Sequence, residues 1–184
     1  MGRRRLPAKP PRATRSASAP REAARSRQAR IVRHDREKDS RIFAYALLNY
    51  LHRTYYLRRR QYGDDLDLAL IAEAIAIAAI DPRMRDPEFR KEYSSMSTIV
   101  GIEGQRGVNA LSISASTAIS RETARRKIKR LVELGVVVET ARGKYVLKPG
   151  IAQSPAQHLM LDELARETVR FINECLDDGV FQLS

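Results

Sequence analysis

The stretch from Leu66 to Ile80 consists almost entirely of Leu, Ile and Ala, and it limits the possible folds more than any other part of the chain. Only Asp67 and Glu73 interrupt it. We predict a helix with acidic residues in its first turn, ending at Asp81-Pro82. A helix that is apolar on most faces lies in the centre of a core or in an oligomer interface. The run is shorter than the roughly 20 residues that span a bilayer, so no transmembrane helix and no membrane partner are expected.

Helical periodicity continues on both sides of this run. Before it, apolar residues recur at spacings of three and four from Phe43 to Leu57, Arg58 to Arg60 follow, and Gly63 is the predicted stop. After it, Asp86-Pro87 opens a further helix with an apolar face at Phe89, Tyr93, Met96 and Val100.

The last part of the chain predicts one more amphipathic helix, which is acidic. Ser154-Pro155 starts it, a stripe from Leu161 to Cys175 forms its apolar face, and Asp177 to Gly179 ends it. Because this helix is acidic, we expect it to lie away from any polyanion, against the preceding helices or a second subunit. Cys175 falls on the stripe and is interpreted as a core residue.

Basic charge is concentrated in two blocks. The chain has 184 residues and a net charge of +12, of which residues 1–38 carry +10 and residues 121–148 carry +6. Residues 39–120 are neutral, and residues 149–184 carry −4. Two concentrated basic blocks indicate a polyanionic partner better than a uniformly basic surface would.

Residues 1–37 are predicted to be a disordered basic arm. Leu6 is the only large hydrophobic residue before Ile31, so the segment buries too little surface to offset its chain entropy. Three interpretations stay open: a solubilising leader, an arm that adds phosphate contacts to a DNA-binding domain, and an organellar targeting segment. The remaining chain divides into a helical bundle or dimerisation region (38–106), a DNA-binding domain (107–150) and the acidic helix (151–184).

Residues 107–150 have the order of elements of a winged helix-turn-helix. Ser112 is expected to cap a short helix, Ile113 to Thr117, which a turn at Ala118-Ile119 connects to a longer helix. Ser120 caps that longer helix and Gly135 ends it. Two short strands follow, Val136–Val138 and Tyr145–Leu147, joined by a turn at Ala141–Lys144. The predicted fold class is therefore mainly α, with one small β-hairpin.

The longer helix separates into two faces. Ala124, Ile128 and Leu131 recur at i, i+4 and i+7 and are predicted to face inward. Its start, its outward positions and the hairpin turn supply the candidate DNA-binding residues: Ser120, Arg121, Glu122, Thr123, Arg125, Arg126, Lys129, Arg130, Arg142 and Lys144. Such a helix lays its N-terminal part against base edges in the major groove.

The segment SRETARRKIKRLVELGVV resembles the recognition helix of bacterial winged-helix regulators, especially the CRP/FNR family and more distantly the GntR family. Eight residues match in register: Ser120, Arg121, Glu122, Thr123, Ala124, Arg126, Leu131 and Gly135. The resemblance implies that Arg121, Glu122 and Arg126 read bases and that Ser120 and Thr123 contact phosphates. The likeness covers about 40 residues. The turn has Ala118 where such motifs often carry Gly, and residues 39–106 do not resemble the CRP/FNR sensor, so no effector is implied.

These patterns predict a sequence-specific, double-stranded-DNA-binding transcriptional regulator. We expect a cytoplasmic homodimer, with Leu66–Ile80 or the C-terminal helix in its interface. The alternative is a winged-helix protein-docking or replication-initiation module. No enzyme, cofactor or metal is expected, since the three His are far apart and there is one Cys. Tyr55 and Tyr56, beside Arg58–Arg60, are interpreted as partly buried at a helix end, with a single-strand stacking platform as the alternative.

Overall fold

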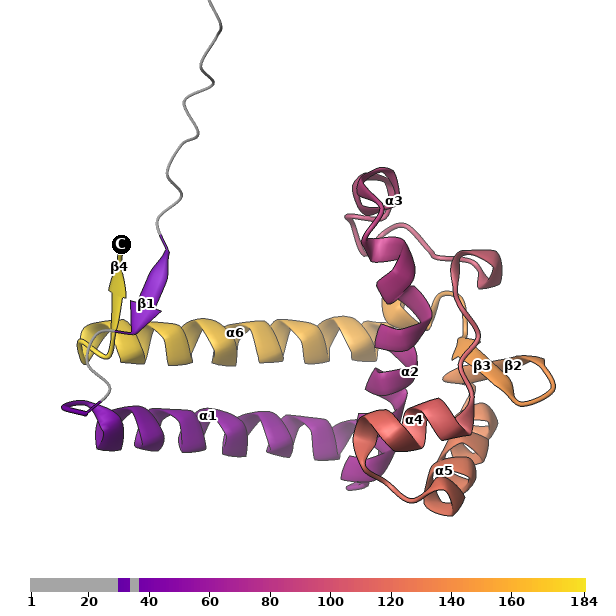
Figure 1. Cartoon of the computed structure of the whole chain (residues 1–184), viewed down its shortest axis with the longest axis horizontal. Helices are drawn as coiled ribbons and strands as arrows, with labels where there is room; N and C mark the ends of the chain where they lie inside the picture. Colours follow the sequence, from indigo (N-terminus) through magenta and orange to yellow (C-terminus); the bar gives the residue numbers. More distant parts are fainter. Residues whose placement is uncertain (1–29, 34–36) are drawn as a thin grey trace, which may run out of the picture.

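The computed structural model describes residues 30–33 and 37–184. Within these residues it contains six α-helices and two small two-stranded antiparallel sheets. Figure 1 shows two parts, which we call the arm and the head. The arm consists of two long helices lying side by side, and the head gathers the shorter helices and a hairpin at one end of the arm. The predicted mainly α class is confirmed.

The arm pairs α1 (Ser40–Gln61) with α6 (Pro155–Asp177), which run in opposite directions (Figure 1). Tyr50 of α1 stacks on Phe171 of α6 with ring centroids 4.9 Å apart, and its hydroxyl lies 3.2 Å from Thr168 Oγ1. Cys175 is buried beside them, as its place on the stripe indicated. Ser154 caps α6 by accepting a hydrogen bond from the Gln157 amide, with Pro155 at the first position.

The head is built around α2 (Leu66–Met84). This helix packs against α4 (Ala110–Thr117), α5 (Arg121–Glu133) and the hairpin, and also touches α1 and α3 (Pro87–Glu92). Leu68, Ile71 and Ile75 of α2 are buried in one cluster with Ile128 of α5. The apolar run is therefore the central core helix of its own chain, one of the two roles that its sequence predicted.

The hairpin pairs β2 (Val137–Ala141) with β3 (Lys144–Leu147) through the two-residue turn Arg142-Gly143. Gly143 has φ of +70°, a conformation that residues with a side chain rarely adopt. Val108 adds a bridge to Tyr145, with reciprocal backbone hydrogen bonds of 2.9 and 2.8 Å. Gly135, with φ of +69°, separates α5 from β2, as predicted, although β2 begins one residue later and runs further than expected.

The two chain ends that the structure describes pair with each other. β1 (Ile31–Arg33) and β4 (Phe181–Leu183) form an antiparallel pair at the tip of the arm, extended by hydrogen bonds between Arg30 and Ser184 (Figure 1). The prediction that residues 1–37 are a disordered basic segment is wrong for residues 31–33, which form β1. Ile31 and Val32 are β-branched, but each segment is only three residues long and its pairing partner lies about 150 residues away, so the sequence pattern did not predict the pair. The rest of that prediction, residues 1–29 and 34–36, lies outside the described residues.

Three predicted helix boundaries need correction. α2 does not end at Asp81-Pro82 but continues to Met84. Pro82 has no backbone N–H to donate in this last turn, which burial of Ala79 and the Arg85–Asp81 ion pair (2.8 Å) support. The short helix starts earlier than Ser112, since Asn109 caps it by accepting from the Ser112 amide at 2.9 Å.

The helix after Asp86 is also shorter than predicted. Asp86 caps α3 as expected, but α3 ends at Glu92. Serine hydroxyls then bond to nearby backbone, Ser94 to the Lys91 carbonyl and Ser95 to the Ser97 amide, and compete with further helical turns. Met96 and Val100 consequently lie in a loop rather than on a helical face.

The turn between α4 and α5 stores strain at Ala118. This residue has φ of +56° and ψ of 13°, the left-handed region that costs a non-glycine residue about 1–2 kcal/mol. Ala118→Gly should therefore stabilise the fold by about 0.5–1 kcal/mol, after the extra chain entropy of Gly is subtracted. Ala115→Gly, at an exposed helical position of α4, should instead destabilise by a similar amount. Urea unfolding of both variants tests this. A loss of stability in Ala118→Gly would contradict it.

Candidate nucleic-acid interface

The start of α5 is defined by a side-chain cap. Ser120 Oγ accepts a hydrogen bond from the Thr123 amide at 3.2 Å and donates to Thr123 Oγ1 at 3.0 Å. Ala124, Ile128 and Leu131 are buried, each at 1% exposure or less. Both the capping residue and the inward face of this helix are as the sequence predicted.

The opposite face of α5 is exposed and predominantly basic. Its side chains follow from the helical period, since residues that are not on the buried stripe must face outward. The exposed candidates are Arg121, Glu122, Arg125, Arg126, Lys129 and Arg130. Arg130 pairs with Glu133 at 3.2 Å, whereas the other four cations make no ion pair within the described residues. No carboxylate of the described residues lies within ion-pair distance of these four cations.

A hollow of about 480 Å³ lies between α5 and the hairpin. It brings together three predicted residues, Arg121 and Arg125 from α5 and Arg142 from the hairpin turn. Glu139 also lines it and accepts a hydrogen bond from the Gly143 amide at 2.6 Å, which holds the turn. Three guanidinium groups around one hollow form a place where an anion such as a phosphate oxygen would be favoured.

Sequence reasoning missed two other residues of this hollow. Asn109 caps α4, and Tyr145 pairs with Val108, so both have structural roles beside the basic side chains. A cap pattern could have pointed to Asn109, but only the tertiary fold places it beside Arg121. Lys144 is exposed at the start of β3 and is not part of the hollow.

Lys127 connects α5 to the beginning of α2. It forms an ion pair with Asp65, whose other oxygen accepts from the Leu68 amide at 3.0 Å and so caps α2. Burial acts to raise the pKa of Asp65, but the hydrogen bonds from Lys127 and Leu68 and the nearby charges of Lys127 and Arg126 outweigh it and lower this pKa below its usual value. This contact adds to the apolar packing of α5 on α2.

The two tyrosines near the end of α1 are more exposed than the sequence predicted. Tyr55 and Tyr56 are exposed, at 53% and 62%, so the expectation that they are partly buried is wrong. The Arg60 guanidinium carbon lies 6.0 Å from the centre of the Tyr56 ring. The reason is that α6 covers the opposite side of α1, through Ala46 and Tyr50.

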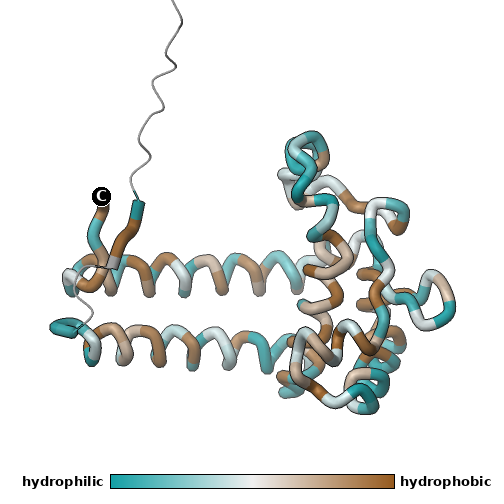
Figure 2. The backbone as a smooth tube through the Cα atoms, viewed as in Figure 1, coloured by the Kyte–Doolittle hydropathy of each residue, from teal (hydrophilic) through white to brown (hydrophobic). Residues whose placement is uncertain are grey.

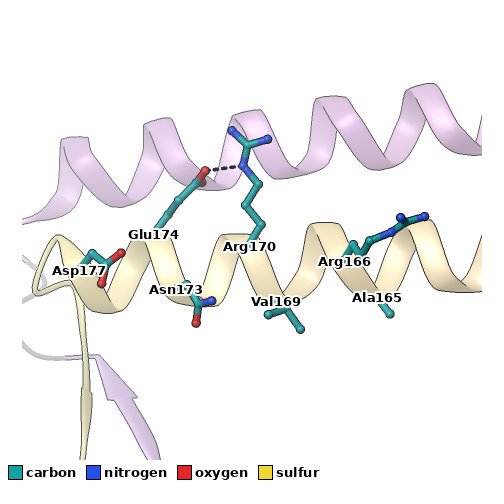
Figure 3. Close-up of a pocket in the computed structure, with 7 residues that line it drawn as sticks. All are labelled: Ala165, Arg166, Val169, Arg170, Asn173, Glu174 and Asp177. Carbon is teal, nitrogen blue, oxygen red and sulfur yellow. Dashed lines mark hydrogen bonds and ion pairs between the residues drawn. The ribbon is translucent and has the colours of Figure 1, made fainter.

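A groove along α6, shown in Figure 3, is lined by Ala165, Arg166, Val169, Arg170, Asn173, Glu174 and Asp177, with Arg170 bonded to Glu174 at 2.8 Å. In residues 30–33 and 37–184, no three His, Cys, Asp or Glu side chains gather in a way that could hold a metal ion. None of the described helices is sufficiently long and apolar to cross a membrane.

No protein-family model matches the chain, and no curated protein or solved structure matches it.

The Asp65–Lys127 contact predicts a pH-dependent stability. Because the pKa of Asp65 is lower in the folded chain, its stabilisation is present above the unfolded pKa of about 4 and is lost as pH falls through the lower folded value. Asp65→Asn keeps a capping side chain but removes the charge, so it should cost about 0.5–1 kcal/mol at pH 7. The difference from wild type should shrink below about pH 4. Urea unfolding across pH measures it.

Asp67→Asn is the matched control for this series. Asp67 is exposed in the same first turn of α2 and makes no ion pair within the described residues. Its substitution should change stability less than Asp65→Asn does. Equal effects of the two variants at pH 7 would show that the contact with Lys127 contributes nothing beyond the general preference for acidic residues at a helix start.

Proposed function

We propose that this chain is a sequence-specific DNA-binding transcriptional regulator, in which α4, α5 and the hairpin act as a winged helix-turn-helix. The observation that carries the proposal is the row of exposed cations on α5 whose opposite face is buried against α2. A helix supported in this way can enter the major groove of a duplex and present its outer side chains to base edges. The unpaired charge then supplies the attraction to phosphates.

The proposed roles along α5 follow from position and chemistry. Arg121 and Arg126 are the candidates for bidentate contacts to guanine, and Glu122 for accepting from cytosine N4. These are also the positions that the resemblance to CRP/FNR recognition helices implies as base-reading. Ser120 and Thr123 lie at the helix start, where their hydroxyls and the first backbone amides suit a phosphate.

The hairpin is proposed to hold the DNA backbone. Arg142 shares a hollow with Arg121 and Arg125, so a phosphate between α5 and the hairpin would meet guanidinium groups from both elements. Lys144 and the remaining cations of α5, Arg125, Lys129 and Arg130, extend this basic surface. Backbone contacts position a protein on the duplex but carry no base information directly.

The proposed regulator acts in the cytoplasm as a homodimer on a two-fold symmetric site. A symmetric dimer presents two copies of α5 to two half-sites, which is the usual way in which helix-turn-helix proteins gain specificity. On α2, α4, α5 and the hairpin of the same chain cover the core-facing side, whereas Leu66, Leu70 and Ile77 stay exposed, so α2 and the C-terminal helix both remain candidate interfaces.

Substitutions on α5 and on the hairpin should separate specificity from affinity. Arg126→Ala should weaken binding to the preferred site by about 1–3 kcal/mol more than binding to random duplex. Lys144→Ala should weaken both by a similar factor and reduce the salt slope by about one contact. The preferred site is first selected from a random duplex pool, and competition binding then measures the ratio for each variant.

Arg90→Ala is the matched control, since Arg90 is an exposed cation on α3, outside the proposed interface. It should leave the ratio of specific to random binding unchanged. If Arg126→Ala keeps the wild-type ratio, α5 does not read bases. Failure to select any duplex from the pool would favour the protein-docking function.

Deleting residues 1–29 should flatten the salt dependence of binding. This segment carries nine Arg and Lys against one Glu, and cations displace condensed counterions from DNA. The deletion keeps the β1–β4 pair, so the described fold is retained. Binding should weaken on all duplexes alike, with the preferred site unchanged. A loss of site preference in the deleted chain would instead assign base reading to residues 1–29.

A further inference from the structure

The arm is a two-helix layer whose two sides differ in chemistry. On one side, Arg53 of α1 reaches two acidic residues of α6, with its Nε 2.5 Å from Glu167 Oε2 and its Nη2 3.5 Å from Glu174 Oε2. These ion pairs identify the charged side of the layer. They also locate the other side, because each residue of a helix is rotated by a known angle from the last.

The opposite side of α1 follows from its contact line. Phe43, Ala46 and Tyr50 face α6. At about 100° per residue, Arg53 lies to one side of this line, and Leu47 and Leu51 lie to the other. The two leucines therefore belong to the side of the layer that lacks the ion pairs.

The same construction applies to α6. Thr168, Phe171 and Cys175 form its contact line toward α1, and Glu167 and Glu174 lie to the side that meets Arg53. Leu161, Ala165 and Ile172 lie on the other side. In Figure 3, Ala165 and Val169 point away from the Arg170–Glu174 pair, and Asn173 points to the same side as they do.

The apolar sides of both helices thus share one side of the layer, which we call the apolar side of the arm. Its large apolar residues are Leu47, Leu48 and Leu51 of α1 and Leu161, Val169 and Ile172 of α6, and the exposed polar residues His158 and Asp162 of α6 lie on the same side. Leu48 and Val169, at its two edges, are 66% and 56% exposed, and Leu161 is 41% exposed. Figure 2 shows apolar residues recurring along both helices of the arm.

The chain itself supplies little to cover this surface. α2 crosses the arm only at its head end, where Arg58 pairs with Glu73. Residues 1–29 contain a single large hydrophobic residue, Leu6, and nine cations, so their composition does not suit an apolar surface. This side is better suited to a partner with an apolar surface of its own.

The area of the surface fits a second copy. A helix of 22 residues is about 33 Å long, and two helices side by side are about 20 Å wide. Each copy would then bury about 650 Å², or about 1,300 Å² in total, within the range of stable protein–protein interfaces. A symmetric dimer brings the same surface of both copies together. An apolar surface can pack against a copy of itself, whereas a charged surface would need a partner of opposite charge.

We propose that two copies of this chain pack through the apolar side of the arm, so that α1 and α6 of each copy form a four-helix interface. This names the surface that joins the homodimer of the proposed function, and it rests on that function only for the reason a dimer is needed. The packing itself requires no DNA.

Sedimentation velocity of the full chain without DNA tests the proposal. At micromolar concentration the wild type should sediment with twice the mass of one chain. Leu48→Glu and Val169→Glu should each raise the dissociation constant at least about tenfold, since each places a charged carboxylate at an apolar contact. Both side chains are exposed in the single chain, so the variants should keep the wild-type helical circular dichroism spectrum.

Tyr45→Glu is the matched control, since Tyr45 is 74% exposed on α1 but lies toward the charged side of the layer. It should leave the dissociation constant unchanged. A monomeric wild type, dimers that persist in both Leu48→Glu and Val169→Glu, or equal dissociation by Tyr45→Glu would each overturn the proposal. Such results leave base reading by α5 intact, and Arg126→Ala should still dimerise, so the two proposals fail separately.

Discussion

The packing of α5 on α2 determines which side chains of α5 reach solvent. Ile128 and Leu131 of α5 are buried in one cluster with Ile71 and Ile75 of α2. Four fully buried side chains of this size contribute about 6–12 kcal/mol, whereas a partly exposed ion pair such as Lys127–Asp65 contributes about 0–1 kcal/mol. Apolar burial therefore orients the helix, and the ion pair adjusts it. The outward cations follow from that orientation.

α2 also connects the head to the arm. Glu73 of α2 pairs with Arg58 of α1, and Tyr62, just after α1, packs against the same core cluster that holds α5. Burial raises the pKa of the Tyr62 hydroxyl, which is consistent with its packing between the arm and the head. Because Tyr62 and α5 pack against the same core cluster, packed side chains determine the position of α5 relative to the arm. In a dimer joined through the arms, that core would set the separation of the two copies of α5.

Local patterns predicted helix starts well where one or two residues decide the outcome. Ser120, Asp86 and Ser154 each cap the helix that the sequence assigned to them. The failures occur where two local signals compete. Asn109 takes the cap that Ser112 was expected to provide, and the serine-rich segment after Glu92 bonds to its own backbone instead of extending α3. Competition of this kind is resolved by small energy differences that a pattern does not contain.

The sequence by itself determined the two faces of α5, the apolar character of α2 and the two basic blocks, because helical period and charge are properties of neighbouring residues. Only the tertiary structure decided which side of α1 is covered. It leaves Tyr55 and Tyr56 exposed, joins Ile31–Arg33 to Phe181–Leu183, and places Arg142 beside Arg121. Each of these outcomes depends on packing between segments far apart in the chain. A periodic pattern shows that a face is apolar, but the residues that cover it lie elsewhere in the sequence.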